Sequence, residues 1–132
     1  MPRIPVMASS AAAIGPYSHG VLTGGGADAL LFLSGQTPID PATGKLVEGS
    51  ITVQTSQCLG NLSAVLQSAG LTFDDVVRCN VFLTDISDFG AMNEAYARHF
   101  QEPYPARTTI GVASLPLGAR IEIELVARAQ RQ

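Results

Sequence analysis

Two short segments near the C-terminal end of the chain combine a cation with carboxylates. Arg107 lies within residues 105–110, and Glu122 and Glu124 lie within residues 120–125, after a short Pro/Gly turn. The β-branched residues around them predict two strands that pair as a hairpin. A guanidinium fork is the usual protein group for binding a small carboxylate through two parallel hydrogen bonds, so Arg107 predicts a site for an organic acid.

Each candidate, taken alone, also has a purely structural explanation. Arg107 can form a surface ion pair, and Glu122, which alternates with Ile121 and Ile123, can belong to a solvated strand face. Tyr17 follows a Gly-Pro pair, and its phenol can either pack or reach a ligand. Residue types alone therefore leave the role of each of these side chains open.

The histidines and cysteines offer little chemistry. His99 is expected in the last turn of a helix, where the helix dipole favours an imidazole, and His19 is a candidate only because it lies near Tyr17. Cys58 and Cys79 lie in apolar periodic segments, which predicts buried, reduced thiols. No pair of these residues or of carboxylates has metal-ligand spacing, so the sequence predicts no metal.

Glycine-rich motifs for nucleotides are absent from the sequence. The three glycines at residues 24–26 are not followed by Gly-Lys-Ser/Thr, and no helix pattern starts there. We interpret residues 24–28 as the tip of a hairpin whose strands cover residues 19–23 and 29–35. The sequence predicts no nucleotide cofactor.

The overall composition predicts one cytoplasmic domain that spans residues 1–132. Hydrophobic residues make up 46% and charged residues 14% of the chain, which predicts apolar surface that meets another subunit. The net charge is −3 and the pI about 5.2, with scattered basic residues, which argues against nucleic acid as a partner. No signal-peptide core or apolar run long enough to span a membrane is present.

The remaining elements follow from hydrophobic spacing. Apolar residues at intervals of three and four predict a helix from residue 50 that ends at Gly70, and a second helix follows residues 85–88. The second helix carries an apolar stripe: Phe89, Met92, Tyr96 and Phe100. Residues 77–83 alternate as a strand, with one apolar face: Val77, Cys79, Val81 and Leu83.

The predicted order is β-β-α-β-α-β-β, with a further N-terminal strand around residues 4–7. The strand at residues 29–35 is a continuous apolar run, which predicts burial on both faces, and residues 38–44 have the composition of a loop. Two helices of four or five turns can cover only one face of the sheet. The other face, with Phe82 and Val126 on it, then needs a partner, and self-association supplies one.

Four segments together resemble the RidA/YjgF family of enamine/imine deaminases, in the order that the family has them: residues 14–20, residues 33–38, residues 89–96 and the Pro-Ala-Arg-Thr of 105–108 with the Ile-Glu-Ile of 121–123. The resemblance implies a chorismate-mutase-like α+β fold with a mixed sheet of about six strands and two helices on one face. It also implies a homotrimer with ligand clefts between subunits.

The resemblance further implies hydrolysis of 2-imino acids, such as 2-iminopropanoate and 2-iminobutanoate, to 2-keto acids and ammonia without a cofactor. In that scheme Arg107 binds the substrate carboxylate, Glu122 positions and partly deprotonates a water, and Tyr17 completes the catalytic group. The backbone around Gly35 and Thr109 lines the cleft. The family also has matching polar residues near the pocket at two further positions, to which we assign supporting, substrate-binding roles: Ser34 and Asn93.

The chain departs from the family pattern in two places. Thr109 stands where many members have a cysteine, and residues 24–28 form a longer segment than in bacterial members. The sequence also leaves three alternative functions open. A regulatory trimer that binds a small acid without turnover would need Arg107 but not Glu122. RNA cleavage or translation inhibition, an older association of the family, is disfavoured by the acidic pI. A pathway-specific deaminase would differ from a general one only in pocket shape.

Overall fold

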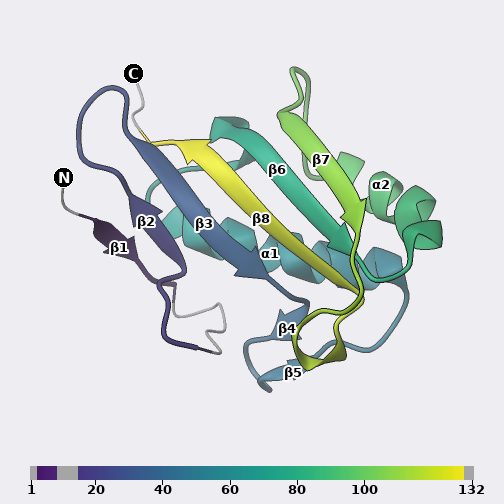
Figure 1. Cartoon of the computed structure of the whole chain (residues 1–132). Coiled ribbons are helices and arrows are strands. Elements are labelled where there is room, and N and C mark those ends of the chain that lie inside the picture. Colours follow the sequence, from purple (N-terminus) through teal and green to yellow (C-terminus); the bar gives the residue numbers. More distant parts are fainter. Residues whose placement is uncertain (1–2, 9–14, 130–132) are drawn as a thin grey trace.

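A six-stranded mixed sheet carries both helices on one of its faces (Figure 1). The computed structural model describes residues 3–8 and 15–129. The strand order is β1-β2-β3-β8-β6-β7, and the only parallel pair in the sheet described is β6 with β7. The six strands are β1 (Ile4–Val6), β2 (Gly20–Leu22), β3 (Leu30–Gln36), β6 (Val76–Leu83), β7 (Ala106–Gly111) and β8 (Ile121–Arg128). The predicted α+β class, element order and additional N-terminal strand are confirmed.

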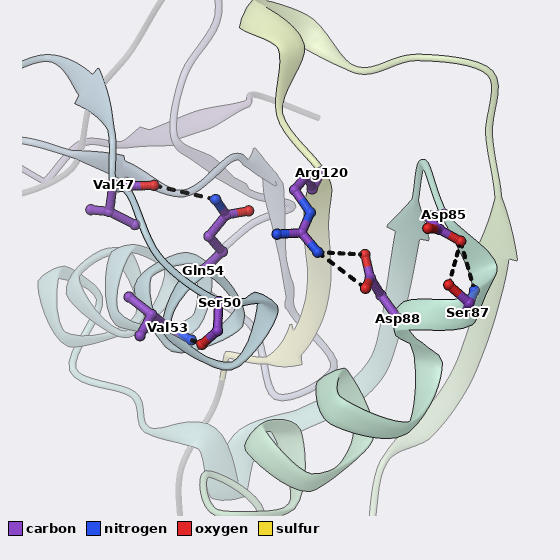
Figure 2. Close-up of polar contacts among 8 residues, drawn as sticks. All are labelled: Val47, Ser50, Val53, Gln54, Asp85, Ser87, Asp88 and Arg120. Carbon is purple, nitrogen blue, oxygen red and sulfur yellow. Dashed lines mark hydrogen bonds and ion pairs between the residues drawn. The ribbon is translucent and has the colours of Figure 1, made fainter.

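The longer helix, α1 (Ile51–Ser68), has the ends that its sequence predicts. The Ser50 hydroxyl accepts a hydrogen bond from the Val53 N–H at 3.3 Å, which caps the first turn (Figure 2). Gly70 follows the last turn with a φ of +74°, a conformation that glycine adopts without strain. The helix buries one complete stripe of side chains against the sheet: Cys58, Leu59, Leu62, Val65 and Leu66.

The second helix, α2 (Phe89–Ala97), is shorter than predicted. It covers nine residues, so the expectation of four or five turns is wrong. Phe100 nevertheless reaches the core from beyond the helix, because its ring stacks on that of Tyr96 with the centroids 4.4 Å apart. At the other end of α2, Arg120 forms an ion pair with Asp88 at 3.0 Å, which connects the start of this helix to the start of β8 (Figure 2).

The predicted hairpin of the last two strands is wrong. Strand β6 lies between β7 and β8, and β7 pairs with β6 in parallel. The physical reason is burial: alternate residues of β8 from Ile121 to Ala127 are at most 2% exposed, and so apolar a row is covered best at the centre of the sheet, beneath α1. Strand β7 is only half-buried at alternate residues and occupies the edge of the sheet.

Two residues that were expected to be buried, Phe32 and Val77, are exposed on the face of the sheet that the helices do not cover. Phe32 is 48% exposed, since β3 turns it away from the helices, so this strand is not buried on both faces. In β6 a register shift between Val76 and Arg78 buries Val76 and leaves Val77 47% exposed, which reverses the predicted assignment of Val77. Cys79, Val81 and Leu83 face the helices as predicted, and both cysteines of the chain are buried and free.

The loop after β3 contains an element that the sequence analysis missed. A small two-stranded ladder, β4 (Ile39–Asp40) with β5 (Lys45–Leu46), begins inside the predicted loop of residues 38–44 and ends just after it. The buried amide of Asn61 on α1 donates hydrogen bonds to the carbonyl of Ile39 at 2.9 Å and to that of Thr37 at 3.3 Å. These bonds fix the chain that leaves β3, next to the site described below. Within the described residues, no helix is both long and apolar enough to span a membrane.

Candidate active site

Arg107 lies on the helix-covered face of the sheet, beside α2. In the register of β6 and β7 it pairs with the buried Cys79, and its guanidinium carbon lies 4.7 Å from the ring centroid of Tyr96 and 5.6 Å from that of Phe89. A pocket of about 450 Å³ opens here. We call this region the arginine half-site; its lining residues are Asn93, Tyr96, Ala97, Tyr104, Pro105 and Arg107.

The Arg107 guanidinium has free hydrogen-bond donors. Arg120 bonds to Asp88 and Arg78 donates to Thr108, but Arg107 makes no hydrogen bond or ion pair with any described residue. It is also half-buried, whereas the other described arginines are exposed. A half-buried guanidinium without a protein carboxylate is placed to bind an anionic ligand.

The groups behind Arg107 are uncharged. Thr109 follows it on the same strand face, and the Thr109 hydroxyl is buried without a hydrogen-bond partner in the described structure. Burial raises the pKa of the Cys79 thiol to about 12, more than the contacts with Tyr96 and Arg107 lower it. Burial also raises the pKa of the Tyr96 hydroxyl, which faces that thiol. Cys79 is therefore a thiol and not a nucleophilic thiolate at neutral pH.

Glu122 lies on the opposite face of the sheet, which the helices leave uncovered; we call this the open face. In the register of β6 and β8 it pairs with Phe82, which also points away from the core. Glu122 lines a cleft of about 640 Å³, which we call the glutamate half-site. The residues around this cleft are Gly15, Pro16, Tyr17, Ser34, Gly35, Gln36, Thr37, Ile39, Pro116, Glu122 and Glu124.

Gly35 lets the Glu122 carboxyl group lie against β3. The pairing of β3 with β8 shifts register between Leu33 and Gln36, and this irregularity brings the backbone of Gly35 under Glu122. A Cβ atom at Gly35 would overlap the Glu122 carboxylate oxygen Oε2 and would lie 2.9 Å from its Cδ. Any other residue at this position would displace the carboxylate.

The Glu122 carboxyl group has a raised pKa. Partial burial is the larger cause, and the charge of Glu124 on the same strand face adds to it. Glu124 in turn accepts a hydrogen bond from the Asn80 amide at 3.0 Å. A carboxylate that is more basic than usual is a better acceptor for the proton of a water molecule.

Ser34 holds the loop that carries Tyr17. Its hydroxyl donates to the Ser18 carbonyl at 2.7 Å, and its N–H donates to the His19 carbonyl at 2.9 Å. The His19 ring is buried and accepts a hydrogen bond from the Ala8 N–H at 3.0 Å, so this histidine has a structural role. Tyr17 is 40% exposed at the rim of the cleft. Ser34 therefore fixes this loop and also lines the cleft, where the sequence analysis predicts a substrate-binding role.

The predicted site residues thus form two groups in one chain. Tyr17, Ser34, Gly35 and Glu122 lie together, and Arg107 lies with the other two predicted residues, Asn93 and Thr109. Two strand spacings and three register steps separate Arg107 from Glu122, which places their Cα atoms roughly 14 Å apart. Their side chains also point to opposite faces, so no small ligand can contact both within one chain.

Sequence reasoning missed three aromatic residues around Arg107: Phe89, Tyr96 and Tyr104. It assigned Phe89 and Tyr96 to the core because they lie on an apolar stripe. The signal that could have found them is spacing: Phe89, Asn93 and Tyr96 are four and three residues apart and share one helix face with a polar side chain in the middle. In residues 3–8 and 15–129, no group of three or more His, Cys, Asp or Glu side chains could hold a metal ion.

The fold and the two half-sites define a small α+β protein that presents a half-buried arginine with free donors and a carboxyl group with a raised pKa. Comparison with known proteins gives its family. A family model described as "Endoribonuclease L-PSP" matches residues 7–129. The chain belongs to this family, which is the RidA/YjgF family indicated by its motifs.

Relatives in this family have different names. The chain is 45% identical over 125 residues to the 2-iminobutanoate/2-iminopropanoate deaminase of Capra hircus, which covers 95% of this chain and 88% of the relative. It is 48% identical over 115 residues to Protein DfrA of Myxococcus xanthus, and this match covers 87% of this chain and 86% of the relative. The crystal structure of E. coli TdcF with bound serine has 36% identity and a TM-score of 0.86 and covers 96% of this chain and 98% of TdcF.

Proposed function

We propose that this protein hydrolyses 2-imino acids, such as 2-iminopropanoate and 2-iminobutanoate, to 2-keto acids and ammonia in the cytoplasm. The observation that carries the proposal is the half-buried Arg107 guanidinium, whose donors bond to no described residue. The deaminase names of relatives at about 45% identity support the same activity. The serine bound to TdcF supports a ligand with a carboxylate, which is the group that an arginine fork binds.

In the proposed reaction, Arg107 binds the substrate carboxylate and so fixes the adjacent imine carbon. Glu122 accepts a proton from a water molecule while the oxygen of that water bonds to the imine carbon. The electron pair of the C=N bond moves to the nitrogen. Glu122 then returns the proton to the nitrogen, which gives a carbinolamine. Glu122 next takes the proton of the new hydroxyl group and passes it to the nitrogen, so that the C–N bond breaks, the keto group forms and ammonia leaves. The raised pKa of Glu122 suits both transfers. Tyr17 and Asn93 supply polar contacts, with the backbone of Gly35 and Thr109 beside them.

This reaction requires Arg107 and Glu122 from different subunits, and we propose a homotrimer with one cleft at each subunit interface. The separation of the two residues within one chain supports this arrangement. The open face supports it as well, because it presents apolar side chains from four neighbouring strands: Phe32, Phe82, Ile110 and Val126. Burying such a surface between copies of the chain is favourable.

A non-catalytic trimer that binds a small acid is the second candidate. It would use Arg107 in the same way, and the TdcF complex is compatible with it. It gives no reason for the close fit of Gly35 against Glu122, because a binder does not need a basic carboxylate over the cleft. The description "Endoribonuclease" of the family model raises RNA cleavage as a further possibility. The net charge of −3 does not favour binding to a phosphate backbone.

The decisive experiment mixes two inactive variants. We expect the wild-type protein to accelerate the decay of 2-iminobutanoate generated in situ by a dehydratase, and Arg107→Ala and Glu122→Gln each to lose this activity. If equal amounts of the two variants are co-assembled into trimers, about one quarter of the clefts combine an intact arginine with an intact glutamate. Activity should recover to about that fraction of the wild-type value.

Each other outcome has a distinct meaning. No recovery on mixing, with mixed trimers verified by mass spectrometry, would place the site within one chain and contradict the composite cleft. Binding of 2-oxobutanoate without any acceleration by the wild type would favour the non-catalytic binder. RNA cleavage that survives in both variants would point to a separate activity.

A further inference from the structure

We propose that Tyr96 is a positioning residue that holds the Arg107 guanidinium flat and directs its free donors toward the carboxylate of the ligand. This inference deepens the proposed function, since it concerns the same arginine. It rests on an arrangement of aromatic side chains around Arg107 and not on the identity of the substrate.

Three side chains lie beside the Tyr96 side chain: Phe100, Arg107 and Cys79. The Phe100 ring stacks on the Tyr96 ring at 4.4 Å with an interplanar angle of 24°, and the Arg107 guanidinium carbon lies 4.7 Å from the Tyr96 ring centroid. The Tyr96 hydroxyl faces the buried Cys79 thiol, and the whole side chain is 5% exposed. Phe73 packs against Phe100 in a tilted arrangement, with the ring centroids 5.0 Å apart.

This stack substitutes for the partners that arginines usually have. An arginine side chain has several rotatable bonds, and elsewhere in the chain a carboxylate orients it, as Asp88 orients Arg120. A carboxylate beside Arg107 would compete with the carboxylate of the ligand for the same donors. An aromatic face attracts the cation without using any N–H, so the N–H groups stay available while the group is oriented. Phe89, at 5.6 Å, adds a second and more distant aromatic contact.

Tyr96 could instead be only a core residue, and the two roles make different predictions. A core residue acts through stability, so its replacement would affect the affinity for charged and uncharged ligands alike. A positioning residue acts on the carboxylate contact, so its replacement weakens binding of the acid and spares an uncharged analogue. Phenylalanine at this position retains the ring and should preserve the role, because the hydroxyl does not face the ligand.

The test measures calorimetric affinities for 2-oxobutanoate and for its uncharged amide, 2-oxobutanamide, together with KM and kcat for 2-iminobutanoate. We expect Tyr96→Leu to weaken 2-oxobutanoate binding and to raise KM by about 3- to 10-fold, with kcat within about 2-fold of the wild type. Tyr96→Phe should stay within about 2-fold of the wild type in every value. Affinity for the amide should not change in either variant.

Equal losses in Tyr96→Phe and Tyr96→Leu, or equal losses for acid and amide, would overturn the positioning role. So would unchanged acid affinity in Tyr96→Leu. If that variant does not fold, Phe89→Leu decides, because Phe89 is 40% exposed and its replacement spares the core. It should weaken acid binding by about 2-fold and leave amide binding unchanged, and no change for the acid would overturn the proposal.

These affinities also separate this proposal from the proposed function. A wild-type protein that binds 2-oxobutanoate but does not hydrolyse the imine would refute the deaminase assignment and leave the role of Tyr96 open to the same comparison of variants. A wild-type protein that binds no 2-oxobutanoate would overturn the role of Tyr96 itself, because Arg107 would then not be a carboxylate anchor.

Discussion

The arginine half-site holds a cation with aromatic rings, whereas the glutamate half-site holds a carboxylate with backbone contacts. Arg107 stacks on Tyr96 and keeps its donors free. Glu122 lies against Gly35 at a strand irregularity, in a cleft whose rim is fixed by the hydroxyl of Ser34. In both cases the protein fixes a charged group without neutralising it. Each half-site therefore lacks the opposite charge that the other provides.

The difference also separates the two kinds of mutation that can damage the protein. The aromatic contacts of the arginine half-site tolerate small changes, because a cation over a ring needs no single geometry. The close approach at Gly35 does not, because a single added carbon overlaps the carboxylate. Changes in the arginine half-site should act on ligand affinity, and changes in the glutamate half-site on the rate of the chemical step.

The largest effect is expected from Arg107→Ala, which removes the carboxylate anchor. We expect kcat/KM for 2-iminobutanoate to fall by about 10²-fold or more, the cost of removing one partner of a charged hydrogen-bonded pair. The matched control is Arg128→Ala, which removes an equal charge from the exposed end of β8 and should retain activity. Equal kinetics for the two variants would show that charge alone, and not the anchor, matters.

Gly35→Ala should damage the glutamate half-site next most severely. The added Cβ atom displaces the Glu122 carboxylate, and we expect kcat to fall by roughly 10- to 100-fold, with a smaller change in KM. The control is Gly25→Ala at the tip of the β2–β3 hairpin, where an added Cβ atom meets nothing within 4 Å. If Gly35→Ala raises KM and spares kcat, the division of roles between the half-sites is wrong.

Ser34→Ala should have a modest effect through the loop of Tyr17. Loss of the bond to the Ser18 carbonyl removes about 1 kcal/mol of net stabilisation from this loop, so we expect a decrease of about 2- to 5-fold in kcat. Amide hydrogen exchange at residues 17–20 should become faster. Ser68→Ala, on the exposed surface of α1, serves as the control and should change neither quantity.

The smallest effect is expected on the stability of Glu122→Gln. This substitution should remove activity but slightly increase the stability of the folded protein. Because the folded pKa of Glu122 lies above its ordinary value of 4.5, the folded state binds more protons than the unfolded state between these two values. This group therefore makes the protein less stable as the pH rises through that window. Glu122→Gln should unfold at a slightly higher temperature than the wild type at pH 7, although it is inactive.

Thermal unfolding from pH 4 to pH 8 checks this expectation. The difference in unfolding temperature between Glu122→Gln and the wild type should grow as the pH rises and then become constant. Glu94→Gln, an exposed change of equal charge on α2, should show no such difference. A Glu122→Gln variant that is less stable than the wild type at pH 7 would mean that the charged carboxylate stabilises the fold.

Local patterns in the sequence predicted an element well when a single apolar face of that element packs in the core. The spacing in α1 and the alternation in β8 each identify a single apolar stripe, and both were assigned correctly. The errors fall where a distant neighbour decides. Val77 is exposed because of an irregularity in the pairing with β8, and Phe32 is exposed because no helix covers its face of the sheet. Neither fact is encoded in a few neighbouring residues.

The candidate site shows the same limit. Motif resemblance selected Arg107, Glu122 and Tyr17, because residue type and order along the chain carry that information. It could not place the first two on opposite faces of the sheet, because this depends on β6 lying between strands that were expected to form a hairpin. The apolar spacing of the second helix placed Tyr96 on the core stripe. Only the structure shows that the same ring packs against Phe100 and lies beside the Arg107 guanidinium.

The sequence by itself determined the family, the kinds of element and the chemical groups available, because these follow from side-chain type and short-range periodicity. Only the tertiary structure decided which groups lie together, since strand order is set by burial across the whole sheet. Strand β8 became central because its apolar row is covered best beneath α1, and β7 was left at the edge. That single consequence of burial places the arginine and the glutamate in separate half-sites within one chain.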